Sequence, residues 1–192
     1  KRQILRDVNL KINNGETMVI LGASGSGKST LLKLIIGLIR PDSGKIRIDG
    51  KEISSFTETE MNEERRHMGM VFQYSALFDS MNVYENVAFG LRQHTEMSEN
   101  EIKRVVEEKL RLVGLKGTGE MLPANLSGGM KKRVSLARAI ALEPQIILYD
   151  EPTAGLDPKG RDEILDQIAY LHKKRNLTVI LVSHSMDDIA KY

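Results

Sequence analysis

The spacing of apolar and polar positions along the chain predicts strands that alternate with helices. Residues 4–12 alternate between apolar and polar side chains, which predicts an early strand. Short, almost wholly apolar runs are typical of buried strands. Such runs predict strands at residues 17–21, 69–72, 146–149 and 178–182, and a further short strand is predicted at 45–48.

Apolar residues that recur every three to four positions predict helices over residues 28–39, 98–113, 126–142 and 159–174. The first should stop before Pro41, and the third should end at Pro144. Ser98 and Glu101 have the spacing of a capping box, which marks the start of the second helix.

This order of elements predicts an α/β fold with a parallel sheet and helices on both faces. The middle of the chain is mostly helical and reads as an inserted subdomain. We therefore expect one domain over residues 1–192, with a core at about 1–75 and 145–192 and a helical subdomain at about 76–144.

Composition narrows the function classes. The chain is 41% hydrophobic and 28% charged, with a net charge of +2 and no cysteine. A charge this small predicts no nucleic-acid partner, and the lack of cysteine excludes disulfides and thiolate metal sites. The apolar runs are far shorter than the ~18 residues of a membrane span, so we expect no direct membrane insertion.

A glycine-rich run follows the strand at 17–21 and precedes a helix, which is the setting of a phosphate-binding loop. The glycines permit tight turns that point N–H groups at phosphate oxygens, and the helix N-terminus favours negative charge. Lys28 has the position to reach the β- and γ-phosphates, and the Ser29 hydroxyl to bind Mg²⁺. The predicted nucleotide-binding residues are Gly22, Ala23, Ser24, Gly25, Ser26, Gly27, Lys28, Ser29 and Thr30.

Two carboxylates, Asp150 and Glu151, follow the apolar strand at 146–149. Ligand sites of parallel α/β sheets lie at such strand ends. Asp150 is placed to hold Mg²⁺, and Glu151 to act as a general base on an attacking water. A solvated acidic turn is the alternative reading, and the phosphate loop disfavours it.

Ser127, Gly128 and Gly129 open a helix and form a second potential anion site. On physical grounds alone, an N-cap serine with two glycines in a turn is the favoured explanation, and the anion site is the alternative. Gln73 and His184 each follow a strand, where an amide could contact metal or water and an imidazole could contact phosphate. Either residue could also be an ordinary surface side chain.

Together these segments resemble the nucleotide-binding domain of ATP-binding cassette (ABC) transporters, a P-loop NTPase with a RecA-like core. The resemblance covers nearly the whole chain. Residues 22–30 resemble its Walker A motif, Gln73 its Q-loop, residues 126–130 its signature, residues 146–151 its Walker B motif, residues 154–157 its D-loop and His184 its switch histidine.

The resemblance implies a head-to-tail dimer that encloses two ATP molecules between the Walker motifs of one copy and the signature of the other. Glu151 would be the catalytic base, His184 a γ-phosphate contact, and Asp157 an interface residue near both sites. Gln73 would contact the metal or the water, beside Ser29 and Asp150 as Mg²⁺ ligands. The implied activity is hydrolysis of ATP to ADP and phosphate.

The implied partner is an integral membrane transporter subunit, which would place the chain at the cytoplasmic face of the inner membrane. A groove beside the Gln73 loop would receive that subunit, and Leu77 and Phe78 are the apolar candidates for the contact. The alternative is that both side chains pack into the helical subdomain. The family's adenine-stacking aromatic would fall before Lys1 and its last strands after Tyr192, so we expect both to be missing.

Residues 72–87 and 126–133 are most similar to Mla/Mkl-type lipid-importer ATPases, whereas residues 157–161 and 183–188 are more similar to energy-coupling-factor importers. The first pair suggests a lipid cargo. Two rival hypotheses stay open: a soluble, non-transporter ABC ATPase, and a truncated nucleotide-binding fragment with little turnover.

Overall fold

The computed structural model describes residues 3–188. Within that range the main sheet has four strands, all parallel, in the order β1-β6-β5-β4. Their bounds are Thr17–Leu21 for β1, Met68–Val71 for β4, Ile146–Asp150 for β5 and Thr178–Ser183 for β6. The predicted α/β class with a parallel sheet is confirmed.

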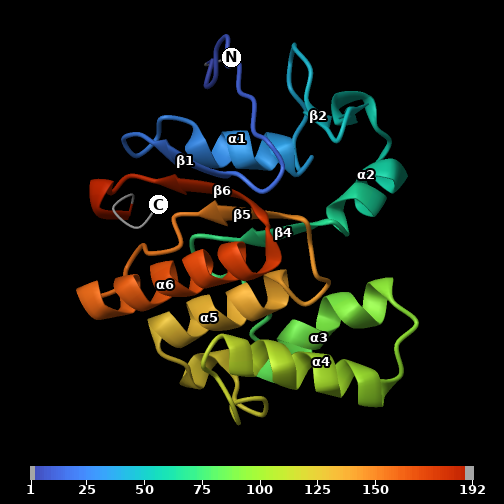
Figure 1. Cartoon of the computed structure of the whole chain (residues 1–192), viewed down its shortest axis with the longest axis vertical. Coiled ribbons are helices and arrows are strands. Elements are labelled where there is room, and N and C mark those ends of the chain that lie inside the picture. The colour runs from blue at the N-terminus through green and yellow to red at the C-terminus, as the bar shows by residue number, and fades with distance from the viewer. Residues whose placement is uncertain (1–2, 189–192) are drawn as a thin grey trace.

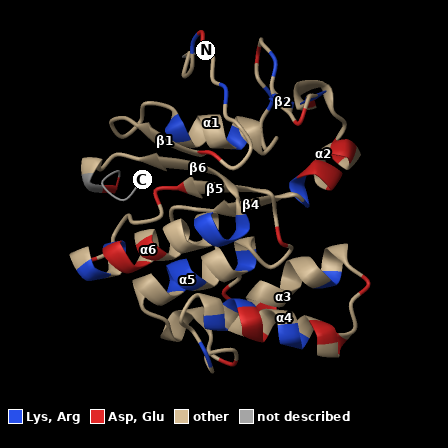
Figure 2. Cartoon of the chain, viewed as in Figure 1, with Lys and Arg blue, Asp and Glu red and all other residues tan. Residues whose placement is uncertain are grey.

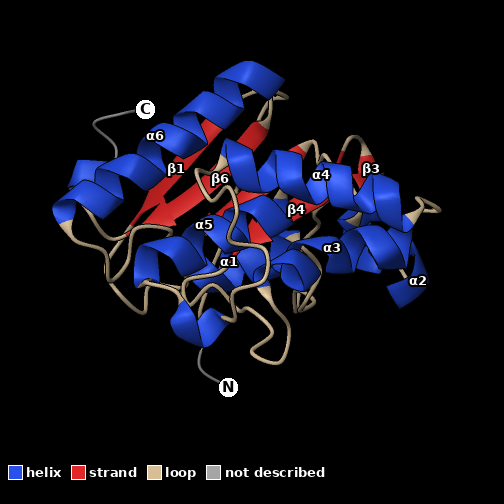
Figure 3. Cartoon of the chain, turned by 90° about the horizontal axis from the view of Figure 1, so that it is seen from below, coloured by secondary structure: helices blue, strands red, loops and turns tan. Residues whose placement is uncertain are grey.

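Helices cover both faces of this sheet, as Figure 1 shows. Helix α1 lies on one face, and α5 and α6 lie on the other, with α3 and α4 beyond α5. Seen from below in Figure 3, α4 and α6 lie in front of the strands. The helices are α1 (Lys28–Ile35), α2 (Glu58–Arg65), α3 (Val83–His94), α4 (Glu99–Leu112), α5 (Gly128–Ala139) and α6 (Pro158–Arg175).

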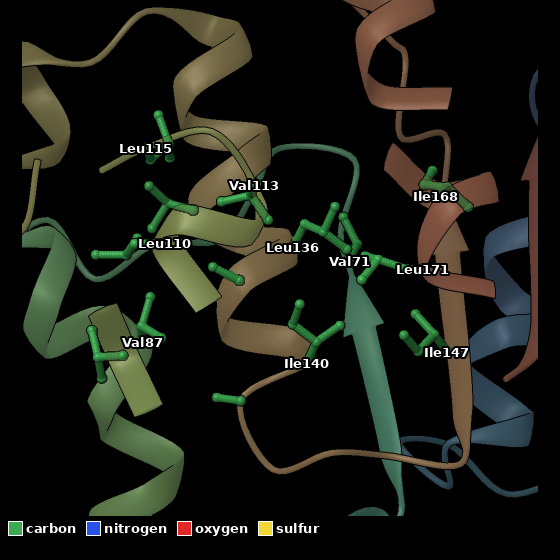
Figure 4. Packing of buried hydrophobic residues seen from close by; sticks show 14 of the residues in the cluster. Val71, Val87, Leu110, Val113, Leu115, Leu136, Ile140, Ile147, Ile168 and Leu171 are labelled. Atoms are coloured by element: carbon green, nitrogen blue, oxygen red, sulfur yellow. The ribbon is translucent and has the colours of Figure 1, made fainter. Parts of the chain in front are cut away.

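The two faces of the sheet bury two apolar clusters. Leu32 of α1 packs with Leu148 and Val182 on the first face. On the second face one larger cluster runs from the strands through α5 to α3 and α4. Figure 4 shows Leu136 and Ile140 of α5 between Val71 of the sheet and the side chains of the outer helices. Helix α5 therefore joins the outer helices to the sheet.

The interpretation of residues 76–144 as a helical subdomain stays a prediction. The large cluster is continuous across its proposed boundary, since Val71 and Ile147 share it with Val87 and Leu110. Lys and Arg residues are interspersed with Asp and Glu residues along the outer helix α4, as the colours of the ribbon in Figure 2 show. Within residues 3–188, no helix combines the length and apolar character needed to cross a bilayer.

The early strand predicted over residues 4–12 is wrong. This segment has no strand structure, and Asp7 has a left-handed φ of 50°. Ile4 and Val8 are exposed, and β1 pairs with β6 rather than with this segment. In the order β1-β6-β5-β4 no other described strand takes the outer edge of β1, so the lack of an edge does not explain the result. The left-handed Asp7 interrupts the extended backbone that a strand needs, and alternating polarity does not reveal it.

Helix 28–39 ends earlier than predicted, at Ile35. The chain turns at Gly37, whose φ is 71°, and a Cβ atom there would lie 2.8 Å from the Met61 side chain. The predicted strand at 45–48 is a two-residue strand, β2 (Arg47–Ile48), which forms a hairpin with β3 (Lys51–Glu52). The close approach of Gly37 to Met61 of α2, which the pattern did not predict, accounts for the early end of α1.

The other boundaries agree closely with the structure. The capping box at Ser98 is present, with both reciprocal hydrogen bonds, and opens α4. Two further capping boxes start α2 at Thr57 and α3 at Asn82, and either could have signalled those helices in the sequence.

Candidate functional site

The glycine-rich loop connects the carboxyl end of β1 to the first turn of α1. Gly27 is the N-cap of α1 with a φ of 97°, and no side chain caps the helix. The first N–H groups of α1 therefore lack a side-chain partner at the cap and suit an anion. Lys28 is buried, and its Nζ donates to the carbonyl oxygens of Gly22 at 2.8 Å and Ala23 at 3.1 Å.

Ser29 of α1 contacts Asp150, the last residue of β5. The Ser29 hydroxyl donates to Oδ1 of Asp150 at 2.8 Å, and Asp150 is buried at the end of β5. A hydroxyl and a carboxylate are hard oxygen donors of the kind that Mg²⁺ prefers. Residues 3–188 hold no group of three or more His, Cys, Asp or Glu residues fit to bind a metal. A magnesium ion here would need phosphate oxygens or water for its remaining ligands.

The carboxylate of Glu151 contacts three of the predicted site residues, namely Gln73, His184 and Lys28. Its Oε2 accepts from Nε2 of Gln73 at 3.3 Å and lies 3.0 Å from Nδ1 of His184, a contact that needs a proton on that nitrogen. Its Oε1 lies 3.6 Å from Nζ of Lys28. The Glu151 side chain is 12% exposed, whereas that of His184 is 54% exposed. The predicted base is thus enclosed beside the phosphate loop, with an opening on the histidine side.

Lys132 of α5 also reaches this site, and sequence reasoning missed it. Its Nζ donates to the backbone carbonyl of Gln73 and, at 3.4 Å, to that of Glu151. The residue is 6% exposed. Burial lowers the pKa of the Lys132 ammonium, and the negative charges of Asp150 and Glu151 oppose that shift. In the sequence it is one of three adjacent cations, and only its position on the buried face of α5 distinguishes it.

A second missed group links the turns that follow β5 and β6. Asp188 is buried, and its Oδ2 accepts from the hydroxyls of Ser183 at 2.5 Å and Thr153 at 2.8 Å. The Ser183 hydroxyl in turn accepts from the N–H of Ser185 at 3.0 Å. These bonds fix the turn that carries His184 next to the turn that follows Glu151.

The Ser127 run lies apart from this cluster. Ser127 caps α5, and its Oγ accepts from the N–H of Met130 at 3.2 Å. A Cβ atom added at Gly128 or Gly129 would meet nothing within 4 Å. Helices α1 and α5 lie on opposite faces of the sheet in Figure 1. The two glycine-rich helix starts thus differ in their surroundings, and the one at α5 faces open space.

Asp157 is likewise placed as a helix cap. It is exposed, and its Oδ1 accepts from the N–H of Gly160 at 3.0 Å at the start of α6. The structure therefore brings Lys28, Ser29, Asp150 and Glu151 together with Gln73 and His184. It leaves residues 127–129 and Asp157 outside that group.

Comparison with known proteins decides the family. The profile of the family described as ABC transporter matches residues 5–154. The chain belongs to the ABC transporter family. It is an ATP-binding cassette ATPase, and the predicted resemblance is confirmed.

Three relatives show how this cassette compares in length. It is 45% identical to the intermembrane phospholipid transport ATP-binding protein MlaF of Haemophilus influenzae, covering 98% of the cassette and 71% of MlaF. It is 47% identical to the energy-coupling factor transporter ATP-binding protein EcfA2 of Clostridium tetani, and the alignment covers 100% of the cassette and 67% of EcfA2. It is 48% identical to the probable ribonucleotide transport ATP-binding protein mkl of Mycobacterium leprae, and the alignment covers 96% of the cassette and 53% of mkl. The cassette thus spans between about half and about seven tenths of these relatives.

A solved structure agrees with the fold. The cassette MJ0796, a dimer in a post-hydrolysis state bound to ADP and Pi, aligns with a TM-score of 0.91 at 35% identity. The alignment covers 98% of this chain and 83% of that one. A relative with this fold thus holds hydrolysis products as a dimer.

Proposed function

We propose that this cassette is the ATP-hydrolysing subunit of a membrane transporter and closes head-to-tail with a second copy around two ATP molecules. The observation that carries the proposal is the cluster of Lys28, Ser29, Asp150 and Glu151 with Gln73 and His184 at one edge of the sheet. The edge is the carboxyl end of parallel strands, where ligands of such sheets bind.

Each residue in the cluster has a role that its geometry allows. Lys28 releases the loop carbonyls of Gly22 and Ala23 and pairs with the β- and γ-phosphates. Ser29 and Asp150, with the amide of Gln73, would hold Mg²⁺, which would supply positive charge against the phosphate oxygens. His184 turns from Glu151 to the γ-phosphate.

Glu151 then accepts a proton from the attacking water. Its carboxylate is already enclosed and is hydrogen-bonded by Gln73. Water oxygen bonds to the γ-phosphorus, the bond to the ADP oxygen breaks, and the proton passes to Glu151. The Ser127, Gly128 and Gly129 cradle of the second copy donates N–H groups to the same γ-phosphate, and Asp157 lies at the interface between copies.

The test of hydrolysis compares the chain with Glu151→Gln. We expect ATP-dependent phosphate release from the unaltered chain and a loss of about a hundredfold or more in the variant, since general-base catalysis supplies that much. Nucleotide binding should persist in the variant. Glu107→Gln, on the exposed face of α4, is the matched control. Equal phosphate release from the chain and from Glu151→Gln would support the fragment hypothesis instead.

We propose that the loop after Gln73 is the docking surface for the membrane subunit. Tyr74 is 88% exposed and Phe78 is 41% exposed, and the Phe78 ring lies 4.9 Å from that of Phe89 between centroids. Apolar side chains gathered on a surface suit a partner. Of the two candidates named from the sequence, Leu77 packs partly into the core, and Phe78 keeps an exposed face.

Arg138 of α5 holds this loop in place. It donates to the carbonyl oxygens of Ser75 at 2.9 Å and Ala76 at 2.7 Å, and its guanidinium lies 5.9 Å from the Phe78 ring centroid. Both loop residues have a left-handed φ, 63° and 46°, which costs about 1–3 kcal/mol each in residues other than glycine. A loop fixed in this way presents its aromatic groups in one arrangement.

Affinity capture from membranes tests the partner. The tagged cassette should retain an integral membrane protein, and a Tyr74→Ser, Phe78→Ser pair should lose it while ATP binding stays unchanged. Tyr170→Ser, which changes an exposed aromatic on α6, is the control. Capture of only ribosomal or DNA-bound material would support a soluble ABC ATPase and contradict the transporter role.

We propose lipid as the cargo and the cytoplasmic face of the inner membrane as the location. The support for lipid is the similarity of residues 72–87 and 126–133 to lipid-importer ATPases. MlaF is named for phospholipid transport, whereas EcfA2 is named for energy-coupling factor transport. Phospholipid bound to the captured membrane complex would favour the first, and its absence with a bound vitamin would contradict it.

A further inference from the structure

Lys132 is the one buried cation of α5 in contact with the catalytic cluster within the described residues. Its ammonium bonds two backbone carbonyls, those of Gln73 and Glu151. Within the described residues, no contact is recorded between Lys132 and the phosphate loop. Lys132 lies on α5, the helix that Ser127 caps. Burying an ammonium group costs free energy, so a buried lysine beside the site suggests a role that offsets this cost.

The two carbonyls belong to segments whose backbone conformations depend on contacts. The Glu151 peptide has two besides Lys132, since its N–H donates to the carbonyl of Val182 at 3.0 Å and its carbonyl also accepts from the N–H of Ala154 at 3.1 Å. Glu151 has a left-handed φ of 46°, and Gln73 lies two residues before the left-handed Ser75. Such backbone conformations persist only where surrounding contacts impose them. One ammonium bonded to both carbonyls fixes the Gln73 peptide relative to the Glu151 peptide, and with them the directions of the two side chains.

We propose that Lys132 is a positioning residue for hydrolysis, which sets Gln73 and Glu151 for attack on the γ-phosphate and ties both to the helix that serves the other copy's ATP. This inference rests on the proposed function of the same site. Lys132 lies five residues after Ser127, or about 7.5 Å along the axis of α5. A displacement of the Ser127 cradle therefore shifts the carbonyls that carry the hydrolytic side chains.

The first test replaces Lys132 by Met, which keeps the length of the side chain and removes its donors. We expect kcat to fall by about ten- to a hundredfold, as misplacement of catalytic groups does. The Kd for ATP, measured with a fluorescent analogue, should stay within about twofold because Lys132 does not touch the phosphate loop. Lys131→Met, the same change one residue earlier on the helix, should leave both values unchanged.

Rescue separates positioning from simple stability. Lys132→Arg keeps hydrogen-bond donors and should retain more activity than Lys132→Met. Lys132→Gln, a smaller change, should lie between the two and replaces the Met variant if that one does not fold. A Met variant with wild-type kcat, or an Arg variant no better than Met, would overturn the inference.

A double-mutant cycle tests whether Lys132 acts through Gln73. If it does, Lys132→Met combined with Gln73→Ala should lose no more activity than the more severe single variant, because the two changes remove one function. Losses that multiply would overturn the inference. A wild-type chain that binds ATP but does not hydrolyse it would contradict the proposed function instead, so the two failures are distinguishable.

Discussion

The chain contains two glycine-rich helix starts that could each hold a phosphate, and they differ in how much of a site surrounds them. At α1, Lys28 is buried, Ser29 is bonded to Asp150, and Leu5 packs on Gly27. At α5, Ser127 is exposed and only caps its own helix, and Gly128 faces open space. The first has the carboxylates of Asp150 and Glu151 beside it, whereas a Cβ atom added at Gly128 or Gly129 would meet no described atom within 4 Å.

This difference teaches that the number of anion cradles does not equal the number of complete sites. A helix N-terminus contributes N–H groups and a partial positive charge wherever it occurs. Chemistry needs further groups, and α1 has them because β5 and β6 end beside it. In the proposed dimer, the α5 cradle contacts the phosphate held by the Walker motifs of the other copy.

The largest expected effect comes from Lys28→Met. Loss of the buried ammonium should weaken ATP binding by about a hundred- to a thousandfold, because it removes one partner of a buried charge pair. Calorimetric titration of the isolated chain with ATP measures it. Lys33→Met, on the same helix but exposed, is the control. Unchanged affinity would show that the α1 start is not the nucleotide site.

Gly128→Asp should separate the two cradles. The added carboxylate repels a γ-phosphate, so hydrolysis by the dimer should fall by about a hundredfold. ATP affinity of the single chain should remain unaltered, and thermal stability should not fall, because an acidic residue is favourable in the first turn of a helix. Reduced ATP affinity in the monomer would remove the distinction between the cradles.

Alanine at single glycines compares the packing of the two cradles. Gly27→Ala should destabilise the fold by about 1–3 kcal/mol, because its φ is 97° and the new Cβ would lie 2.8 Å from Leu5. Gly129→Ala should be neutral or stabilise by up to about 1 kcal/mol, since it enters a helix with no neighbour within 4 Å. Chemical denaturation measures both, and equal losses would contradict the comparison.

Acid should lower the free energy of unfolding of the whole fold, which carries both cradles, and this is the smallest of the expected effects. Lys109 and Arg175 lower the pKa of Glu143 from 4.5 to about 2, so its contribution to stability is complete above pH 4.5 and is lost as pH falls towards 2. Solvent reduces this contribution because the Glu143 side chain is largely exposed. Unfolding curves between pH 6 and about 2 should show less acid sensitivity in Glu143→Gln, with Glu107→Gln as control.

The parts of the fold that the sequence predicted are those set by local pattern. Strands β1, β5 and β6 appear as apolar runs, and the capping box at Ser98 placed the start of α4. Residues 4–12 were mispredicted because alternating polarity does not reveal the left-handed φ of Asp7, which interrupts an extended strand. The early end of α1 depends on Gly37 against Met61, a contact between segments far apart in the sequence.

The candidate site divides in the same way. The phosphate loop and Asp150 were predictable because spacing alone specifies them. Lys132 and Asp188 were missed because their partners are backbone carbonyls and hydroxyls on other elements. Only the three-dimensional arrangement shows that a lysine on α5 contacts the backbone at the ends of β4 and β5.

Mixing two inactive chains tests most directly whether the α5 cradle completes another copy's site. Lys28→Met has a defective phosphate loop and Gly128→Asp a defective cradle, so their mixed dimer contains one composite site in which both halves are intact. Equal mixing should restore hydrolysis to about a quarter of the wild-type rate, because half of the dimers are mixed and each has one good site. A mixture as inactive as its two components would contradict the account.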